Sequence, residues 1–212
     1  MAGIRILIAD DHSLIRRGIR SLLESRRDWE ICGEAVNGRE AVKQVAKLKP
    51  DVVVMDITMP ELNGLEAMRQ IISVSPRTEV LILTMDNSEE VARHVLRAGA
   101  RGIVLKSDVD SLLISAVDAL SQHQPFLTPG VARIVLDKFV KEGQGDYEPL
   151  TAREREIVQL LAEGKSNKSV ASTLGISVKT AESHRANIMR KLSLRSVSDL
   201  VRYAVRNKIV SA

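Results

Sequence analysis

Residues 51–60, which read DVVVMDITMP, decide the fold, because an apolar run, Asp51–Met55, leads directly into an acid, Asp56. Three other apolar runs also end at polar side chains: Ile4–Ala9 at Asp10 and Asp11, Val80–Leu83 at Thr84, and Gly102–Leu105 at Lys106. In an open parallel sheet, ligands bind outside the carboxyl ends of the strands. Acids, a hydroxyl and an amine at one such edge predict a site for a cation and a phosphoryl group.

Helical patterns alternate with these runs, which is typical of a parallel α/β sheet. A short strand at Glu30–Ala35 completes a set of five. The five expected helices are Leu14–Glu24, Arg39–Leu48, Gly64–Ser73, Ser88–Arg97 and Asp108–Ser121. The expected capping groups are Ser13 for the first helix, Asn37 with Glu40 for the second, and Ser107 with Asp110 for the fifth.

The pattern changes after residue 121. Pro125, Pro129 and Gly130 flank a short helical stretch, Val131–Lys141, and residues 143–149 have the composition of a linker. Beyond the linker no strand pattern recurs, and four capped helices are expected: Arg153–Ala162, one from Ser166 to Leu174, Val178–Leu192, and one from Ser196 onward. The expected domains are thus 1–121, a linker with a short helix at 122–148, and 149–212.

Charge is divided unevenly between the two parts. Residues 149–212 hold 12 Lys and Arg against 5 Asp and Glu, a net charge of +7, whereas residues 1–148 hold 19 against 22, a net charge of −3. A basic C-terminal part is typical of a domain that binds nucleic acid, although a basic face is also often merely solvated. Aromatic residues make up only 2% of the chain, which argues against stacking on single strands.

The composition also predicts a cytoplasmic protein with no membrane partner. The lone Cys32 can form no intramolecular disulfide, which favours a reducing compartment. No apolar run approaches the roughly 18 residues that cross a bilayer. The N-terminal run is broken by Arg5 and ends in two acids, unlike a signal peptide.

If the carboxylates of Asp10, Asp11 and Asp56 lie a few Å apart at one edge, each pair repels by about 4 kcal/mol at an effective dielectric constant of about 20. Either one is protonated or a hard cation lies among them, and Mg²⁺ fits best because it binds one or two carboxylates together with water and phosphate oxygens. Asp56 could then attack a phosphoryl group and form an aspartyl phosphate. Lys106 would bind the phosphate as a point charge, and Thr84 would donate a neutral hydrogen bond.

Each of these residues has a simpler interpretation when it is taken alone. Asp10 or Asp11 could cap the first helix, Thr84 could be a strand-end hydroxyl, and Lys106 could be a surface amine. Asp56 is harder to explain in this way, because Thr58-Met59-Pro60 follows and no helix begins there. The coincidence of suitable groups at all four strand ends favours the phosphoryl site.

Asp10-Asp11-His12, Asp56 with residues 57–64 (ITMPELNG), Thr84 and Lys106, in this order and spacing, resemble the receiver domain of two-component response regulators. The resemblance covers residues 1 to about 121 and implies a (βα)5, doubly wound parallel sheet in the order 2-1-3-4-5. It also implies that a sensor histidine kinase, or a small acyl phosphate, phosphorylates Asp56. By this resemblance Asp11, Asp56 and the backbone carbonyl of Thr58 bind Mg²⁺ directly, and Asp10 binds it directly or through water. Lys106 and Thr84 contact the phosphoryl oxygens.

Two positions depart from the receiver pattern. Many receivers carry Tyr or Phe three residues before the lysine, with a ring that turns inward when the threonine shifts, but Ile103 stands here. Receivers also often place Pro directly after the lysine, where this chain has Ser107. Neither departure removes the acceptor chemistry, but both leave the route of the signal open.

The caps of the C-terminal part predict a helix–turn–helix, in which the second, longer helix can enter the major groove. One face of that helix, with Ala181, Ile188 and Leu192, would point to the core. The opposite stripe is formed by Lys179, Glu182, Ser183, Ala186 and Arg190. An ordinary amphipathic surface helix would show the same two faces, but the basic charge, the caps and the tight turn favour DNA binding.

Residues 150–156 (LTARERE), 164–168 (GKSNK), 174–180 (LGISVKT) and 184–192 (HRANIMRKL) resemble the LuxR-type (GerE-type) four-helix DNA-binding domain. The whole chain is therefore similar to NarL/FixJ-type response regulators. This resemblance implies that Glu182, Ser183 and Ala186 face base edges. The residues placed to hold DNA phosphates are Lys165, Lys179, Thr180, Arg185 and Lys191.

We therefore expect a DNA-binding transcription regulator, not an enzyme, that is switched by phosphorylation of Asp56 and hydrolyses its aspartyl phosphate slowly. Phosphorylation would free the recognition helix from the receiver and favour a homodimer on DNA. Leu200, Val201 and Ala204 are candidate dimer contacts, with packing inside the monomer as the alternative. Two other classes stay open: a phosphatase, which would need an acid in place of Thr58, and a constitutive DNA binder whose receiver only dimerises.

Overall fold

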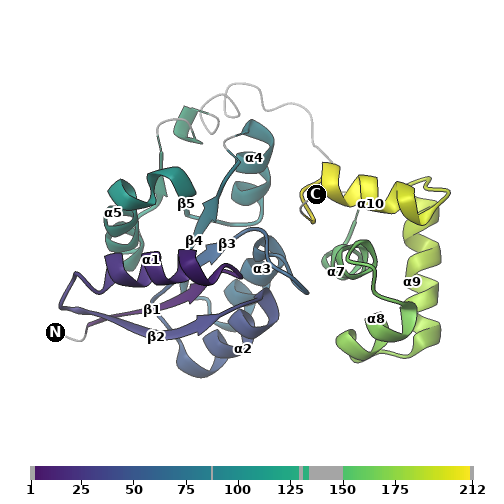
Figure 1. Ribbon diagram of the computed structural model, residues 1–212, viewed down its shortest axis with the longest axis horizontal. Coiled ribbons are helices and arrows are strands. Elements are labelled where there is room, and N and C mark those ends of the chain that lie inside the picture. The colour runs from purple at the N-terminus through teal and green to yellow at the C-terminus, as the bar shows by residue number, and fades with distance from the viewer. Residues whose placement is uncertain (1–2, 87, 129–130, 134–149, 211–212) are drawn as a thin grey trace. The chain divides into compact units, whose positions relative to one another are not determined.

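The computed structural model describes residues 3–86, 88–128, 131–133 and 150–210, and it divides into two compact units, Met1–Gly143 and Gln144–Ala212. The first unit contains a six-stranded parallel sheet (Figure 1). Its strands are β1 (Ile4–Ala9), β2 (Trp29–Ala35), β3 (Val52–Asp56), β4 (Glu79–Thr84), β5 (Gly102–Leu105) and β6 (Phe126–Leu127). Their spatial order is β2-β1-β3-β4-β5-β6. The expected α/β class and the order 2-1-3-4-5 are confirmed, with one further strand at the β5 edge.

Helices cover both faces of this sheet. They are α1 (Ser13–Leu23), α2 (Gly38–Leu48), α3 (Gly64–Val74), α4 (Glu89–Arg97) and α5 (Val109–Ser121). Because successive strand residues point to opposite faces, the strands feed two separate apolar cores. Leu7 and Val53 pack in the core shared with α2, α3 and α4, whereas Ile6 and Val54 pack in the core shared with α1 and α5. Burial on both faces explains why the strands read as continuous apolar runs.

Two of the expected helix caps are wrong. Ser13 is the first residue of α1 and the N-cap position is His12, which makes no side-chain capping bond. The Asp10 carboxylate instead accepts the His12 amide hydrogen at 2.7 Å. Ser107 lies in a 3₁₀ turn, Lys106–Asp108, so that α5 begins at Val109 without a side-chain cap. The expected cap at Asn37 is confirmed, since its side chain accepts the Glu40 amide hydrogen at 2.8 Å.

Strand β6 was not expected from the sequence. It pairs in parallel with β5, with Phe126 beside Gly102 and Leu127 beside Ile103. Two residues are too few to show a strand period, so the pattern could not indicate it. Of the expected helix Val131–Lys141, residues 131–133 are helical, and the rest lies outside the described residues, as does the linker 143–149.

The second unit consists of helices, as expected: α7 (Ala152–Ala162), α8 (Asn167–Leu174), α9 (Val178–Lys191) and α10 (Val197–Arg206). Capping boxes at Thr151 with Glu154 and at Ser196 with Asp199 open α7 and α10. Gly175, with a φ of +63°, ends α8 in the left-handed conformation that glycine adopts without a steric cost. Within the described part of the chain, no helix is both long and apolar enough to cross a membrane.

Replacing Thr151 with Ala removes the reciprocal cap of α7, in which Glu154 also accepts the Thr151 amide hydrogen at 2.7 Å. We expect the second unit to lose about 1 kcal/mol of stability. Urea unfolding of the full chain, followed by far-UV circular dichroism, should show an earlier helical transition. The fluorescence of Trp29, the only tryptophan, should show an unchanged transition for the first unit.

The matched control is Thr173→Ala, at an exposed threonine in the last turn of α8. This variant should unfold within about 0.5 kcal/mol of the wild type, as is usual for surface substitutions. Equal losses of stability in the two variants would contradict the role of the capping box.

Candidate functional site

The carboxyl edge of the sheet gathers the polar groups that the strand ends predicted. Asp56 and Thr84 are the last residues of β3 and β4, while Asp10 follows β1 and Lys106 follows β5. The Nζ atom of Lys106 lies 2.8 Å from Oδ2 of Asp10 and 3.0 Å from Oδ2 of Asp56. Asp10 is 0% exposed and Asp56 is 4% exposed. One buried ammonium group therefore bridges two buried carboxylates.

Asp11 and His12 form the outer part of the same site. Nδ1 of His12 lies 2.9 Å from Oδ1 of Asp11 and 3.3 Å from Oδ1 of Asp10. Single ligand-type atoms of Asp10, Asp11, His12 and Asp56 all lie within 4.8 Å of one another. Carboxylate oxygens are the ligands that a hard divalent cation prefers, so the three aspartates fit Mg²⁺. Sequence patterns did not indicate the contacts of His12, which appeared only as part of the receiver motif.

Burial controls the protonation of Asp56. It raises the pKa of this carboxyl group to about 6, while the charge and the hydrogen bond of Lys106 act in the opposite direction. Burial alone would lower the pKa of the Lys106 ammonium, but its hydrogen bond to Asp10 and the charge of Asp56 outweigh burial and raise that pKa. Lys106 therefore stays charged at neutral pH, and Asp56 takes up a proton as the pH falls through about 6.

The loop after Asp56 is held close to the end of β3. The Gly64 amide donates to the Ile57 carbonyl oxygen at 2.7 Å. A Cβ atom at position 64 would lie only 2.1 Å from the Asp56 carbonyl oxygen, so the loop requires glycine there. Asn63 accepts the Glu66 amide hydrogen at 3.0 Å and caps α3 at this point. The start of α3 thus fixes the backbone that presents Asp56, and the Thr58 amide donates to the Asp56 carboxylate.

Thr84 and Ile103, the residues assigned to signal transmission, are both buried, at 5% and 2% exposure. The Thr84 hydroxyl accepts the Asp86 amide hydrogen at 3.0 Å. Ile103 packs in the same apolar core as Val91 and Val95 of α4. The position where many receivers have an aromatic residue is therefore occupied by a buried aliphatic side chain, in the core that also contains residues of α4.

Helix α9 has the two faces expected from its sequence. Ala181 and Ile188 are buried, at 1% and 0% exposure, and form part of the apolar core of the second unit. Glu182, Ser183 and Ala186 are exposed on the opposite face. The other residues expected to contact DNA are exposed, or half-buried in the case of Arg185: Lys165, Lys179, Thr180, Arg190 and Lys191.

Two of these cationic side chains have partners within the unit. Nζ of Lys191 lies 2.8 Å from Oε2 of Glu154, the acid of the α7 capping box. Arg190 donates to Oδ1 of Asn187 at 2.9 Å. A phosphate would have to compete with Glu154 for Lys191, so we expect Lys179 to contribute more to DNA affinity than Lys191 does.

Helix α10 requires a correction to the candidate dimer contacts. Leu200 and Ala204 are 1% and 0% exposed and belong to the apolar core of the second unit. They pack inside the monomer, which was the alternative, because the same stripe of α10 faces α7. Val201 is half-buried and stays a candidate for a contact with a second copy.

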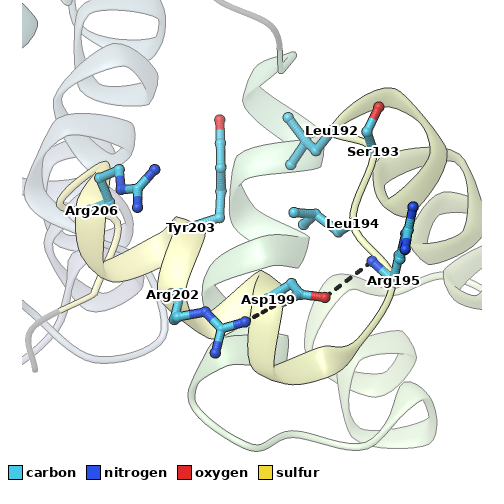
Figure 2. Close-up of a pocket in the computed structure, with 8 residues that line it drawn as sticks. All are labelled: Leu192, Ser193, Leu194, Arg195, Asp199, Arg202, Tyr203 and Arg206. Atoms are coloured by element: carbon cyan, nitrogen blue, oxygen red, sulfur yellow. Dashed lines mark hydrogen bonds and ion pairs between the residues drawn. The ribbon is translucent and has the colours of Figure 1, made fainter.

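A pocket lies between α10 and the connection from α9 (Figure 2). Its lining residues are Leu192, Ser193, Leu194, Arg195, Asp199, Arg202, Tyr203 and Arg206. Asp199 accepts the Arg195 amide hydrogen at 3.2 Å and forms an ion pair with Arg202, so it offsets part of the positive charge. None of the residues expected to contact DNA lines this pocket.

Comparisons with known proteins agree with both parts of the chain. Residues 6–118 match the response regulator receiver domain, and residues 148–204 match the bacterial regulatory proteins of the luxR family. The chain belongs to the two-component response regulators. This response regulator is of the NarL/FixJ type, a DNA-binding regulator of transcription that is controlled by phosphorylation.

The response regulator resembles its relatives over its whole length. It is 38% identical over 216 residues to the oxygen regulatory protein NreC of Staphylococcus epidermidis, with 98% of this chain and 99% of the relative covered. The structure of RcsB from Salmonella enterica serovar Typhimurium, bound to promoter rprA in the presence of phosphomimetic BeF3⁻, shares 30% identity at a TM-score of 0.63 and covers 95% and 98% of the two chains. ChrA, from a heme-sensing two-component system, shares 33% identity at a TM-score of 0.54, with 99% and 100% covered.

Replacing Asp56 with Asn should stabilise the metal-free response regulator above pH 6. Because the folded pKa of about 6 exceeds the ordinary value of 3.8, the folded protein holds this carboxylate ionised at a cost above pH 6. Two pKa units correspond to about 3 kcal/mol, the upper limit of the expected gain. The gain should shrink as the pH falls from about 6 to about 4 and should vanish below about pH 4, where Asp56 is protonated in both the folded and the unfolded wild type. Urea unfolding with a metal chelator, at a series of pH values, measures it.

Asp110→Asn, at an exposed acid in the first turn of α5, is the control for the removal of one negative charge. It should destabilise slightly, by at most about 1 kcal/mol, because an acid near a helix N-terminus is favourable. A loss of stability in Asp56→Asn at pH 8 would contradict the inferred cost of burying this carboxylate.

Proposed function

We propose that Asp56 accepts the phosphoryl group that controls this response regulator. The observation that carries the proposal is the Lys106 ammonium group, which lies within 3.0 Å of both Asp10 and Asp56 at the carboxyl edge of the sheet. A carboxylate with a fixed cation beside it is suited to attack phosphorus, because the same cation stabilises the negative charge that develops on the phosphoryl oxygens. The domains that serve this function are 1–121, the linker 122–148, and 149–212.

Mg²⁺ is the proposed cofactor of this site. Asp11 and Asp56 would hold it directly, Asp10 directly or through water, and Thr58 through its backbone carbonyl. When bound, the ion supplies positive charge that neutralises the phosphoryl oxygens. The support is the donor set itself, in which carboxylate oxygens of the three aspartates lie within 4.8 Å of one another.

The transfer step follows from the positions of these side chains. A carboxylate oxygen of Asp56 forms a bond to phosphorus, and the bond from phosphorus to the histidine nitrogen of a sensor kinase, or to the oxygen of an acyl phosphate, breaks. Lys106, now paired with Asp10 and Asp56, then turns part of its hydrogen bonding to the phosphoryl oxygens. The Thr84 hydroxyl now donates to the Asp86 carbonyl oxygen at 3.4 Å, so its O–H must leave that acceptor before it can donate to the phosphoryl oxygens. Phosphorylation therefore rearranges the loop after β4.

The product is held rather than turned over quickly, so the protein acts as a regulator and not as an enzyme. A phosphatase with an aspartate nucleophile needs a second acid two residues later to activate the leaving group or water. Thr58 stands at that position, with its backbone amide bonded to Asp56. Slow hydrolysis of the aspartyl phosphate is therefore expected.

The output is DNA binding by a dimer. RcsB was solved on DNA, in one case with a phosphomimetic present. In this chain we propose that the receiver covers α9 in the inactive state and that phosphorylation releases it. A change from mostly inactive to mostly active needs about 5.5 kcal/mol of differential stabilisation, which the added charge and its contacts can largely supply.

A regulator of transcription acts where the chromosome is, in the bacterial cytoplasm, and its second partner is a sensor histidine kinase.

Labelling with ³²P-acetyl phosphate tests the acceptor. Wild type should incorporate label in the presence of Mg²⁺ and almost none when a metal chelator is added beforehand, and Asp56→Asn should incorporate almost none in either case. Asp110→Asn, the exposed control, should label as the wild type does. Equal labelling of wild type and Asp56→Asn would contradict the proposal. DNA binding that stays the same after labelling would favour the constitutive DNA binder.

The salt dependence of DNA affinity tests the proposed phosphate contacts. Each lost phosphate contact lowers the slope of log K against log salt by about 0.9. We expect this change for Lys179→Gln on a short duplex, because Lys179 is exposed at the start of α9. The control is Lys47→Gln, at an exposed lysine of α2 in the receiver, which should leave the slope unchanged. Equal slopes for Lys179→Gln and the wild type would show that Lys179 does not contact a DNA phosphate.

A further inference from the structure

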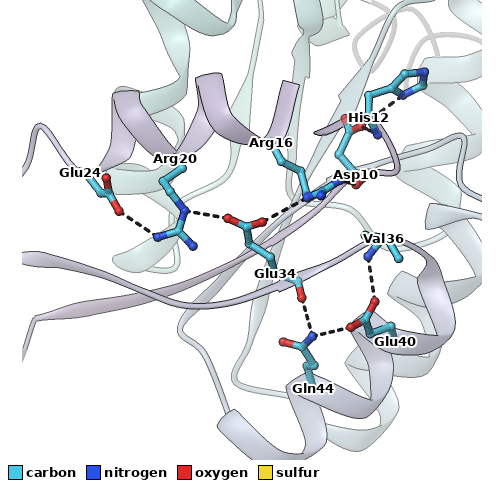
Figure 3. A network of polar contacts seen from close by, with 9 residues as sticks. All are labelled: Asp10, His12, Arg16, Arg20, Glu24, Glu34, Val36, Glu40 and Gln44. Atoms are coloured by element: carbon cyan, nitrogen blue, oxygen red, sulfur yellow. Dashed lines mark hydrogen bonds and ion pairs between the residues drawn. The ribbon is translucent and has the colours of Figure 1, made fainter. Parts of the chain in front are cut away.

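A network of ion pairs joins α1 to the end of β2, next to the proposed Mg²⁺ site (Figure 3). The Glu34 carboxylate lies between two arginines of α1, with Nε of Arg16 at 3.2 Å and Nε of Arg20 at 2.7 Å. Arg20 also pairs with Glu24 at 2.9 Å. The hydrogen bonds from Arg20 and Arg16 lower the pKa of Glu34, so this carboxylate stays ionised. The two arginines thus share one acidic partner.

Only one of the two arginines reaches the acidic site. Nη1 of Arg16 donates to the carbonyl oxygen of Asp10 at 2.8 Å. The other polar groups of Asp10 also have partners: its amide donates to the Ala35 carbonyl, and its carboxylate accepts from the His12 amide and from Lys106. Arg16 therefore supplies the contact on the one remaining polar atom, at the point where the chain turns from β1 into Asp11 and His12.

The geometry of Arg16 suits this double contact. A guanidinium group is planar and presents its N–H donors in fixed directions, so that a carboxylate on one edge determines where the other donors point. Glu34 is fixed in turn, because β2 pairs with β1 and places Glu34 beside Ile8. The Arg16 side chain is 15% exposed and that of Glu34 is 32% exposed, so the access of water to these bonds is limited mainly on the arginine side. Sheet, acid and guanidinium together hold the Asp10 carbonyl in place.

We infer that Arg16 is a positioning residue for the Mg²⁺ site, an inference that rests on the proposed function. By holding the Asp10 carbonyl, it fixes the turn that presents the carboxylates of Asp10 and Asp11. Residues that orient metal ligands typically change metal affinity by about 10- to 100-fold when they are removed. Sequence patterns missed Arg16 because it flanks the apolar stripe of Ile15 and Ile19, where an arginine reads as solvated.

Calorimetric Mg²⁺ titration of the full chain tests the inference, with three variants. Arg16→Gln should weaken Mg²⁺ binding by about tenfold or more. Arg16→Lys keeps the charge but loses the fixed donor directions, so it should restore only part of the affinity. The matched control is Arg20→Gln, which loses the same partner, Glu34, without a contact to Asp10. It should bind Mg²⁺ within about threefold of the wild type.

A second measurement separates positioning from general stability. Urea unfolding of the metal-free proteins should show comparable losses in Arg16→Gln and Arg20→Gln. Each variant loses its bonds to Glu34 and one further contact, with the Asp10 carbonyl for Arg16 and with Glu24 for Arg20. In ³²P labelling, Arg16→Gln should need more Mg²⁺ for half-maximal labelling, in proportion to its weaker binding. A merely structural role predicts losses of stability with no change in the Mg²⁺ requirement.

Two results overturn the inference: Mg²⁺ binding by Arg16→Gln within twofold of the wild type, or equally weakened binding by Arg20→Gln. Both are distinct from failure of the proposed function. If wild type neither binds Mg²⁺ nor incorporates label at Asp56, the proposed function and this inference fail together. If wild type does both and Arg16→Gln is unaffected, only the role of Arg16 is lost.

Discussion

The ion pair of Lys106 with Asp10 and Asp56 is the interaction on which the site depends. Two carboxylates buried this deeply would repel each other and take up protons in the absence of a nearby cation. Lys106 offsets one of the three negative charges of Asp10, Asp11 and Asp56, so that the ionised site carries a net charge of −2. That is the charge that one divalent cation neutralises. The lysine keeps the receiver stable without metal while leaving the site attractive to Mg²⁺.

This ion pair depends in turn on the register of the sheet. Asp56 pairs with Leu83 beside it, and Thr84 pairs with Leu105, so that three strands end at the same level. A slip of one residue would turn each of these side chains to the opposite face of the sheet. The two apolar cores prevent the slip, because alternate strand residues such as Val53 and Val54 are buried on opposite faces. Packing far from the edge therefore fixes the chemistry at the edge.

The features that depend on neighbouring residues in the chain could be predicted from the sequence. The features that depend on contacts between distant segments could not. Strand ends and the caps at Asn37 and Thr151 follow from neighbours in the chain, and the structure has them. Ser13 is a plausible cap by the same rules, but α1 begins one residue earlier than expected, so that Ser13 is already helical and His12 occupies the N-cap position. The apolar stripe of α10 that contains Leu200 could equally have packed inside the monomer or against a second copy, and the sequence pattern is the same in both cases. The role inferred for Arg16 depends on Glu34, which lies in a different strand, and no spacing within α1 indicates it.

Packing around β5 limits how a change at Asp56 can be transmitted to the DNA-binding unit. Ile103 is buried in the core that β5 shares with α4, and in such a densely packed interior a large movement of one side chain requires its neighbours to shift. We therefore expect a shift of the Thr84 loop to move α4 and β5 together, since no single aromatic ring is available to rotate. Because β6 is paired with β5, with Leu127 beside Ile103, we expect such a shift to act on β6 as well. Because Ile103 stands where many receivers have an aromatic residue, this position has no ring that could turn inward, and we expect the packed strands β5 and β6 to respond together.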